Sequence, residues 1–387
     1  MDEKEIKNTT LIVLTHILFR QIEEKEKPVA GPYSSVIGAL EQLTDKTILL
    51  GIPLSGYKNP VLIGAPKNPK EICIPPIIGK YFPIKYLADF FISLFLLIKL
   101  LISSKGSIVV ISIDPLSTLP ALILKPFFGF KLIFYCVDFN KNRFGSRLMQ
   151  SGYEIADKFA SIYANQVWVV CESLRKYKKE YFGVGSRYTP NSFPFDDALY
   201  RNNKTKRTGN KVVWTGSTIT EKQADDIIKV ATGLQKIKPN LEFWFVPINR
   251  HEYFKHKIGE LKIKNSKIFD VAGQKESREL VSQCDVGLAI YDKDFGSTRF
   301  IEPIKVWEYA LCGIPYIISR EPSVNSDAVK GGVAFLLEEN NSLPNSKKIS
   351  NFLERDNLKK LQNASIELAK RFDIVSVIKE SFTKLST

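Results

Sequence analysis

The sequence has few of the residues that build metal and redox sites. Its 387 residues include 3 histidines and 5 cysteines. The cysteines are widely spaced, form no C-x-x-C pair and lie mostly in apolar segments, which is typical of reduced thiols in a core. His251 and His256 are five positions apart, which does not place both on one helix face. The sequence therefore predicts no disulfide framework and no metal site.

A long uninterrupted apolar run is also missing. Residues 81–102 are the most hydrophobic stretch, but Lys85, Asp89 and Lys99 interrupt it, so we do not expect a membrane span. The stretch fits either a core helix or an amphipathic helix that lies on the bilayer, with lysines meeting anionic headgroups. The N-terminus is charged where a signal peptide is apolar, which predicts a cytoplasmic protein.

Positive charge, by contrast, is abundant. The formal net charge is +14, with 44% hydrophobic and 25% charged residues, as in a soluble globular protein. Such a charge suits nucleic acid, an anionic membrane surface or phosphate-bearing ligands. No aromatic-interleaved basic run points to nucleic acid, so the other two classes of partner are favoured. The length favours two domains.

Alternating strand and helix patterns predict an α/β fold. Residues 10–14 begin an apolar strand that ends at His16. It is followed by a charged loop at 21–27, a loop around Gly31, a helix and a strand at 46–52. This order is the opening of a doubly wound sheet. The G-x-G-x-x-G signature is absent, so NAD binding is not predicted. We expect domains at 1–195 and 211–371, a polar linker at 196–210 and a C-terminal helix at 372–387.

Residues 286–313 have the features of a site for a nucleotide diphosphate. An apolar strand leads through a polar loop to Pro303, a residue favoured at the start of a helix. The free N–H groups and the positive dipole end of that helix suit a phosphate. Lys305 adds a full positive charge there. Glu308, three positions on, can accept hydrogen bonds from sugar hydroxyls.

A second turn with these features follows the strand at 211–214. In the segment 215–217 (TGS), Gly216 lets the backbone approach a phosphate closely. Lys222, in the first turn of the next helix, opposes the helix dipole unless it meets an anion. A solvated Lys222 and a phosphate-binding Lys222 are both consistent with this position.

The segment 303–315, PIKVWEYALCGIP, resembles the donor-binding segment of GT-B glycosyltransferases, in which P-x-K-x-x-E-Y-x-x-x-G-x-P recurs. The resemblance implies two Rossmann-like domains that face each other across a cleft, with the nucleotide sugar bound to the second. It implies that Glu308 binds the ribose, that basic residues hold the diphosphate and that Gln274 lies in the loop contacting the base. The implied donor-binding residues are Gly216, Ser217, Lys222, Gln274, Arg299, Ile304, Lys305 and Glu308.

One position departs from the family pattern. The retaining branch usually has a second glutamate eight residues before Glu308, where this chain has Phe300, and Glu302 is out of step with it. The lysine-containing segment is more similar to lipid-linked-sugar transferases such as the xanthan glucuronosyltransferase, which invert. Inversion and retention therefore both stay open.

Two residues are candidates for the catalytic base. Asp138 follows the apolar strand at 131–137, and the ligand crevice of a parallel sheet lies at the carboxyl ends of its strands. The sequence FYCVD resembles a stretch of GT-B enzymes whose final aspartate is the base, a task that partial burial favours. His16 also ends a strand, and the resemblance places it with Gly31 at the acceptor. The alternatives are that Asp138 caps the following turn and that His16 is structural.

These observations predict a metal-independent hexosyl- or glycuronosyltransferase without a cofactor. It would move a sugar from a nucleotide-diphosphate sugar to a hydroxyl of a glycan or lipid-linked acceptor in polysaccharide biosynthesis. We expect a cytoplasmic protein, peripheral on the inner face of the cell membrane through residues 82–102, and no nucleic-acid partner. A nucleotide-sugar epimerase and a non-catalytic scaffold protein with the same fold are the alternatives, and Phe300 favours the scaffold.

Overall fold

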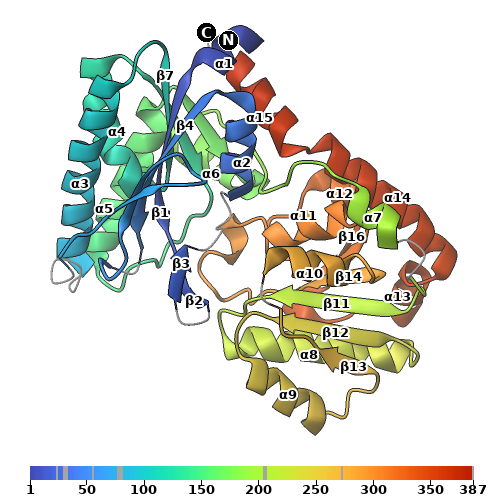
Figure 1. The fold of residues 1–387 in the computed structure, drawn as a ribbon. Coiled ribbons are helices and arrows are strands. Elements are labelled where there is room, and N and C mark those ends of the chain that lie inside the picture. Colours follow the sequence, from blue (N-terminus) through green and yellow to red (C-terminus); the bar gives the residue numbers. More distant parts are fainter. Residues whose placement is uncertain are drawn as a thin grey trace. The chain divides into compact units, whose positions relative to one another are not determined.

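A computed structural model describes residues 1–22, 25–28, 34–54, 56–75, 82–203, 207–271 and 273–385. The chain forms two compact units (Figure 1): unit 1 contains Met1–Asn191 and Ile374–Thr387, and unit 2 contains Ser192–Asp373. Residues 196–210, expected as a linker, lie within unit 2 and include helix α7 (Ala198–Asn203).

Unit 1 is built on an eight-stranded sheet. Its strands are β1 (Thr10–Ile17), β4 (Lys46–Pro53), β5 (Val61–Gly64), β6 (Lys70–Ile72), β7 (Ile108–Ile113), β8 (Lys131–Cys136), β9 (Gln166–Val169) and β10 (Arg187–Tyr188). They lie in the order β10-β9-β8-β7-β1-β4-β5-β6, and all pairs are parallel except β4–β5 and β5–β6. The chain winds outward from β1 in both directions, so the topological switch point lies between β1 and β7.

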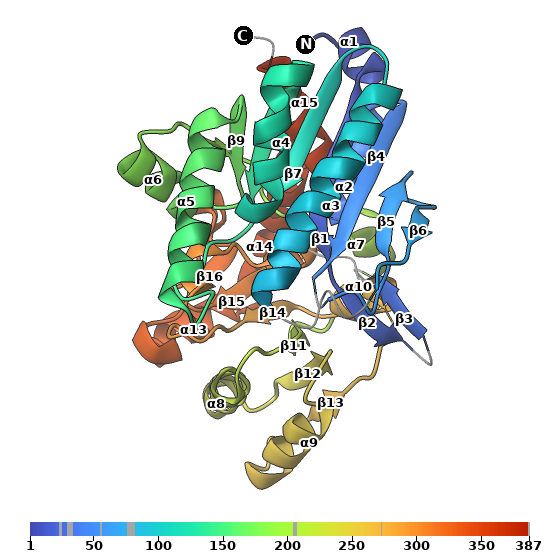
Figure 2. The ribbon, with the colours of Figure 1, turned by 90° about the vertical axis from the view of Figure 1, so that its left-hand side faces the viewer.

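Helices cover both faces of this sheet. They are α1 (Glu3–Asn8), α2 (Ser34–Leu43), α3 (Phe82–Ser103), α4 (Pro115–Phe128), α5 (Arg147–Tyr163), α6 (Glu172–Phe182) and α15 (Ile374–Thr383). In Figures 1 and 2, α3, α4 and α5 form one layer, with α2 and α15 on the opposite face. The C-terminal helix α15 belongs to unit 1, where the ring of Phe382 lies 5.9 Å from that of Trp168.

The helix expected at 81–102 is α3, which has one buried side. Leu97 and Leu101 pack in the core of unit 1, and Lys85 pairs with Asp89 inside the unit. By length and composition, the helical segment 83–103 could cross a membrane: the mean hydropathy of its most apolar window is 2.0. Only 28% of that window is buried inside the protein. The other side of α3 is therefore open.

Two features of unit 1 were not evident from the sequence pattern. Within the charged segment expected as a loop at 21–27, the described residues 21–22 and 25–27 belong to two antiparallel strands, β2 (Phe19–Ile22) and β3 (Lys25–Pro28). The segment has no hydrophobic alternation that would have predicted strands. Lys178 of α6 forms a fully buried ion pair with Asp157 of α5, with its Nζ 5.1 Å from the centroid of the Phe134 ring.

Unit 2 is a smaller sheet of six parallel strands. These are β11 (Lys211–Gly216), β12 (Glu242–Pro247), β13 (Ser266–Ile268), β14 (Val286–Ala289), β15 (Tyr316–Ile318) and β16 (Ala334–Leu336). The order β13-β12-β11-β14-β15-β16 is that of a Rossmann sheet, with its switch point between β11 and β14. The strand predicted at 211–214 is confirmed as β11, and the apolar strand predicted from position 286 is confirmed as β14, which ends at Ala289; these two strands flank the switch point.

The helices of unit 2 place the segment 303–315 at that switch point. They are α8 (Glu221–Ile237), α9 (His251–Glu260), α10 (Gln274–Val281), α11 (Ile304–Leu311), α12 (Ser326–Lys330), α13 (Ser346–Phe352) and α14 (Arg355–Arg371). The predicted helix after Pro303 is confirmed as α11. Tyr309 of α11 donates a hydrogen bond to the Leu288 carbonyl at 2.9 Å. A Cβ on Gly287 would come within 2.4 Å of the Tyr309 ring, so this glycine lets α11 lie close against β14.

Candidate functional site

A buried lysine without a partner lies on α11 of unit 2. The Nζ of Lys305 is 5.0 Å from the ring centroid of Trp214 and 5.3 Å from that of Tyr291. Among the described residues it has no hydrogen-bond partner. Desolvation lowers the pKa of Lys305 to about 8, against a smaller opposing effect of Glu308. A buried ammonium of this kind is costly unless an anion binds to it.

Gly216 leaves space beside this ammonium. It ends β11 with a φ of 122°, which glycine adopts readily and other residues do not. A Cβ at this position would lie 3.1 Å from the Nζ of Lys305. Ser217 follows it and is half-buried. Gly216 and Lys305, predicted from separate segments of the sequence, therefore lie together.

Glu308 forms the second part of this site. Its Oε1 accepts hydrogen bonds from Gln274 Nε2 at 2.7 Å and from Arg278 Nε at 3.3 Å. Burial raises the pKa of Glu308, and the charge of Arg278 and the bond from Gln274 act in the opposite direction. Gln274, expected in a loop, is the first residue of α10 and lies against Glu308, and contact of either residue with a donor stays a prediction.

Arg278 was not singled out in the sequence. Its guanidinium lies 4.0 Å from the ring centroid of Phe193, and its Nη2 is buried without a hydrogen-bond partner among the described residues. The signal that could have found it is its position four residues after Gln274 on one helix, which puts both side chains on one face. Arg278 and Lys305 thus supply two unsatisfied cationic donors in unit 2.

Two other predicted donor residues are placed differently. The Nζ of Lys222 lies 3.0 Å from Asp292 Oδ1 and also pairs with Asp294, and these bonds raise the pKa of Lys222. Arg299 is exposed on a 3-10 turn, Thr298–Phe300. Two carboxylates already neutralise the charge of Lys222, and Arg299 faces solvent. Contact of Lys222 or Arg299 with a diphosphate therefore stays a prediction.

The segment that departs from the family pattern is well packed. Phe300 is buried, and the carboxylate of Glu302 accepts a hydrogen bond from Trp307 Nε1 at 2.8 Å. Ile304, the first residue of α11, is half-buried. Glu302 is thus held by the packing of its own segment and does not replace the glutamate expected at position 300.

In unit 1, Asp138 lies just beyond the end of β8. Its side chain is 42% exposed, and its Oδ1 lies 3.4 Å from Nη1 of Arg143. Desolvation raises the pKa of Asp138, the charge of Arg143 lowers it and that of Asp114 raises it further. The following turn is held by Asn140, whose Oδ1 accepts from the Asn142 N–H at 2.8 Å. Asp138 is thus a partly open carboxylate that can accept a proton.

Asp114 is a further carboxylate at this edge of the sheet. It follows β7, and its Oδ2 lies 3.0 Å from Nη2 of Arg143, which therefore bridges two aspartates. Its Oδ1 also accepts the Leu116 N–H at 2.9 Å and caps α4. The φ of Asp114 is 87°, a strained value for a residue other than glycine and one that is frequent at functional sites. Its position between a strand and Pro115 was the signal available in the sequence.

His16 is held by bonds to both of its ring nitrogens. Nε2 lies 3.2 Å from Asp89 Oδ2, and Nδ1 lies 3.1 Å from Ser117 Oγ. Asp89 also pairs with Lys85 Nζ at 2.6 Å and accepts a hydrogen bond from Tyr57. Burial acts to raise the pKa of Asp89, but the bonds and charges of His16 and Lys85 lower it. The network orients His16, and a catalytic role for it stays a prediction.

The remaining predicted residue, Gly31, lies outside the described residues. Within the described ranges, no group of three or more histidine, cysteine, aspartate or glutamate side chains is close enough to hold a metal ion.

No protein-family model matches the sequence, and no curated protein sequence matches it. Solved structures do match. The sucrose-phosphate synthase from Thermosynechococcus elongatus has 13% identity and a TM-score of 0.65, with 98% of this chain and 99% of that chain covered. HepE from Anabaena, crystallised with UDP, has 13% identity and a TM-score of 0.61, with 97% and 99% covered.

A third match is a TarM variant from S. aureus, crystallised with UDP, Fondaparinux and alpha-GlcNAc-glycerol. Its identity is 13% and its TM-score 0.57, over 77% of this chain. The chain spans only 59% of the length of TarM. At such identities the likeness shows the fold, an α/β architecture of two parallel-sheet units.

Proposed function

The chain has the GT-B fold, and on this premise we propose that it is a glycosyltransferase acting on a nucleotide-diphosphate sugar. The observation that carries the proposal is a pair of buried nitrogen atoms, Lys305 Nζ and Arg278 Nη2, that have no hydrogen-bond acceptor among the described residues. A dianionic diphosphate satisfies both. HepE and the TarM variant, which share the fold, were crystallised with UDP, which is a ligand of this class.

In this proposal the donor binds along the switch point of unit 2. The diphosphate lies beside Gly216, where the absent Cβ leaves room next to the Lys305 ammonium. Glu308 accepts hydrogen bonds from the ribose hydroxyls, in exchange for or in addition to its bond from Gln274. The loss of water that lowers the pKa of Lys305 also strengthens its attraction to the phosphate.

The chemistry needs a base and a stabilised leaving group. The acceptor hydroxyl attacks the anomeric carbon, its proton passes to the Asp138 carboxylate, and the bond from that carbon to the diphosphate oxygen breaks. The diphosphate leaves with the electron pair, and Lys305 and Arg278 stabilise its negative charge without a metal. A base that acts in one direct displacement gives inversion at the anomeric carbon, so retention would exclude this role for Asp138.

We further propose that the acceptor is a glycan or lipid-linked precursor of a cell-surface polysaccharide. The protein would act in the cytoplasm, peripheral to the inner face of the membrane, with residues 82–102 in contact with the lipid. The open apolar side of α3 and the net charge of +14 support this part. The transferred sugar would be a hexosyl or glycuronosyl group.

Thermal shift against UDP, GDP, dTDP and CMP and their sugars tests the donor site. A ligand at about 100 times its Kd stabilises the fold by about 2.7 kcal/mol, which is readily detected. Glu308→Gln should weaken the response to one nucleotide, whereas Glu279→Gln, on the exposed side of α10, should leave it unchanged. If no nucleotide stabilises the wild type, the donor-site proposal fails.

Turnover separates the enzyme from a scaffold protein. Mixed with the nucleotide sugar that binds and with glycan or lipid-linked acceptors, a transferase releases free nucleoside diphosphate and forms a glycosylated product. The buried Phe300, in place of an expected glutamate, is the observation that favours a scaffold. Binding without any release of nucleotide would support that second function.

A further inference from the structure

Most of the exposed large hydrophobic side chains of the described residues lie on one layer of unit 1. On α3 they form a single stripe along the whole helix: Ile84, Leu87, Phe91, Phe95 and Ile102. On α4, every exposed residue is apolar: Ile123, Pro126, Phe127 and Phe128. Figure 2 shows α3, α4 and α5 side by side, and we call their outer side the three-helix face. Monomeric proteins rarely leave such a face uncovered.

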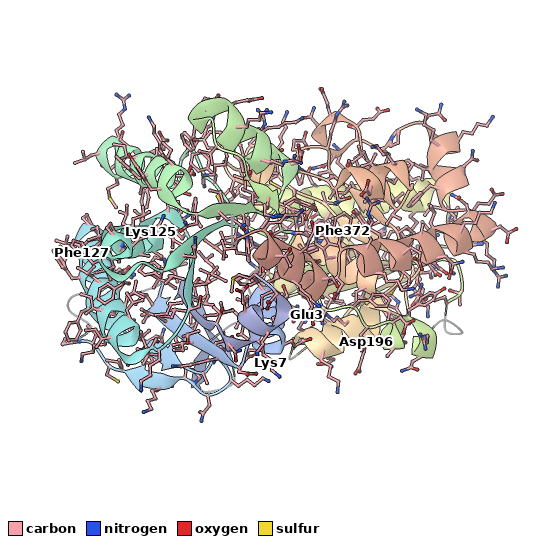
Figure 3. The ribbon with its side chains drawn as sticks, turned by 90° about the horizontal axis from the view of Figure 1, so that it is seen from above. Glu3, Lys7, Lys125, Phe127, Asp196 and Phe372 are labelled. Carbon is pink, nitrogen blue, oxygen red and sulfur yellow. The ribbon has the colours of Figure 1, made fainter. Side chains whose placement is uncertain are left out.

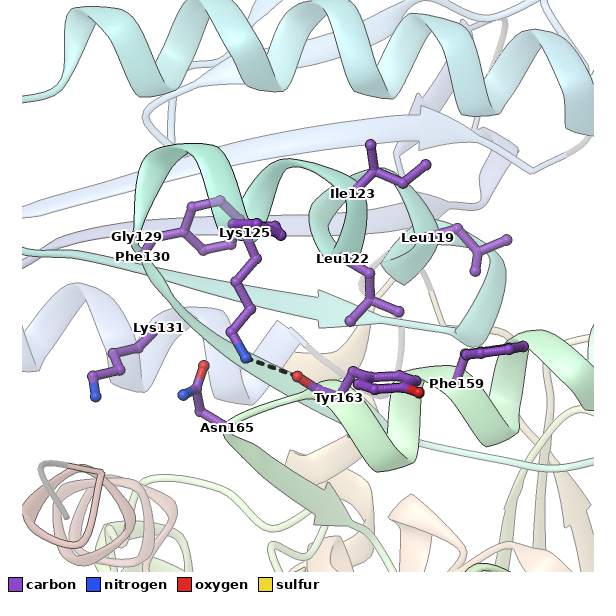
Figure 4. A pocket seen from close by; sticks show the side chains of 11 residues that line it. Leu119, Leu122, Ile123, Lys125, Gly129, Phe130, Lys131, Phe159, Tyr163 and Asn165 are labelled. Atoms are coloured by element: carbon purple, nitrogen blue, oxygen red, sulfur yellow. Dashed lines mark hydrogen bonds between the residues drawn. The ribbon is translucent and has the colours of Figure 1, made fainter.

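The face continues onto α5 through a hollow. Ile155, Phe159 and Ile162 are exposed at helical spacing on α5. Between α4 and α5 lies a cavity of about 570 Å³, lined largely by apolar side chains such as Leu122 and Phe159 (Figure 4). It opens at the amino end of β8, the end opposite to Asp138. The hollow is therefore separate from the candidate catalytic residues of unit 1.

The exposed charges of this layer are mostly positive: α5 adds one exposed carboxylate, Glu154, and two exposed cations, Arg147 and Lys158. Between residues 82 and 131 the only carboxylates are Asp89 and Asp114, and both are buried in ion pairs. Lys99, Lys105 and Lys131 are exposed in the same range. Figure 3 shows Phe127 beside Lys125 at the outer end of α4. Anchoring aromatic rings next to an excess of lysines are typical of a surface that meets anionic headgroups and acyl chains.

We propose that the three-helix face binds an anionic lipid bilayer, with its aromatic side chains at the acyl boundary and its lysines among the headgroups. This inference extends the contact proposed for residues 82–102 to α4 and α5, and it rests on that part of the proposed function. α3 has 22 residues and is about 33 Å long. Because Leu97 and Leu101 hold its other side in the core of unit 1, the bilayer contacts α3 along its side. Fluid acyl chains can also fill the hollow.

A second copy of the chain is the rival occupant. A two-fold interface places the same patch opposite itself, so the cations of one copy would face those of the other, with Glu154 the one exposed acid among the described residues of α3, α4 and α5 to offset them. The apolar stripe of α3 also offers almost no hydrogen-bonding groups to orient a protein partner. Lysine repulsion and the lack of directional contacts both favour the bilayer.

Flotation with vesicles tests the proposal. The full chain should bind vesicles of equal parts phosphatidylglycerol and phosphatidylcholine, and bind phosphatidylcholine alone far more weakly. Lys99→Gln with Lys131→Gln should lower the partition coefficient about 30-fold, since each lysine near an anionic surface is worth about 1 kcal/mol. The matched control, Lys347→Gln with Lys348→Gln on α13 of unit 2, should leave it nearly unchanged.

A second pair of variants tests the apolar part. Phe91→Ser with Phe127→Ser should reduce binding at least tenfold, whereas Leu261→Ser with Leu336→Ser, exposed on unit 2, should not. The proposal is overturned if the wild type ignores anionic vesicles, if face and control variants bind equally, or if ultracentrifugation shows a dimer that the phenylalanine variants dissociate. Nucleotide-induced thermal shifts should persist in all four double variants, so a failed donor site and a failed membrane face are told apart.

Discussion

Replacing Lys305 by methionine should change stability and nucleotide affinity in opposite directions. Methionine has a similar length but no charge. Desolvation lowers the pKa of Lys305 from 10.5 to about 8. In the folded protein without ligand, the charged Lys305 therefore costs free energy that it does not cost in the unfolded chain. A difference of this size corresponds to about 3 kcal/mol.

These free energies set the size of the change expected in the melting temperature and in the affinity for nucleotide. Removal of that cost should raise the melting temperature of the ligand-free protein by several degrees, since 1 kcal/mol corresponds to about 2–4 °C for a unit of this size. A hydrogen bond to a charged group is worth about 1.5–3 kcal/mol, so the variant should bind the nucleoside diphosphate about 10- to 150-fold more weakly. Lys229→Met, at an exposed position of α8, is the control and should change neither quantity.

The pH dependence gives a second readout. Between pH 8 and 10.5 the unfolded chain binds more protons at Lys305 than the folded chain, so this residue makes stability rise with pH across that window. Chemical denaturation at several pH values should show the rise in the ligand-free wild type and lose this contribution in Lys305→Met. Bound nucleotide should suppress it, because the anion keeps the ammonium charged. A variant that is less stable than the wild type and binds nucleotide equally well would refute the reasoning.

Three further changes have defined outcomes. Asp138→Asn should lower the transfer rate about 10²- to 10⁴-fold with little effect on donor binding, and unchanged turnover would exclude it as the base. Lys178→Met should lower the free energy of unfolding, measured with denaturant, by about 3–5 kcal/mol, because Asp157 is left buried without its partner. The control is Lys176→Met at an exposed position, and an equal effect of the two variants would contradict the prediction. Gly216→Ala should abolish most of the nucleotide-induced thermal shift, because the new Cβ meets the buried lysine of α11 and because a φ of 122° is strained for alanine. A full shift in this variant would show that no ligand approaches this turn.

The local structure of this protein could be predicted from its amino-acid pattern. Strands and helices alternate with clear apolar periodicity, so the two α/β units and their order could be predicted. The start of α11 directly after Pro303 and the spacing of Lys305 and Glu308 are set within one turn of helix, where neighbours in sequence are neighbours in space. Gly216 was visible for a similar reason, as a glycine directly after a strand.

Which side chains are paired, buried or exposed depends on contacts between distant segments and could not be predicted from the pattern. Lys222 meets Asp292 seventy positions along the chain, and Asp89 reaches His16 from α3, so no local pattern could show whether either charge was satisfied. The hydropathy of α3 could not tell which of its sides is covered, because burial depends on the sheet and on α4. Periodicity records what a segment can bury, and the packing of distant segments decides what it does bury.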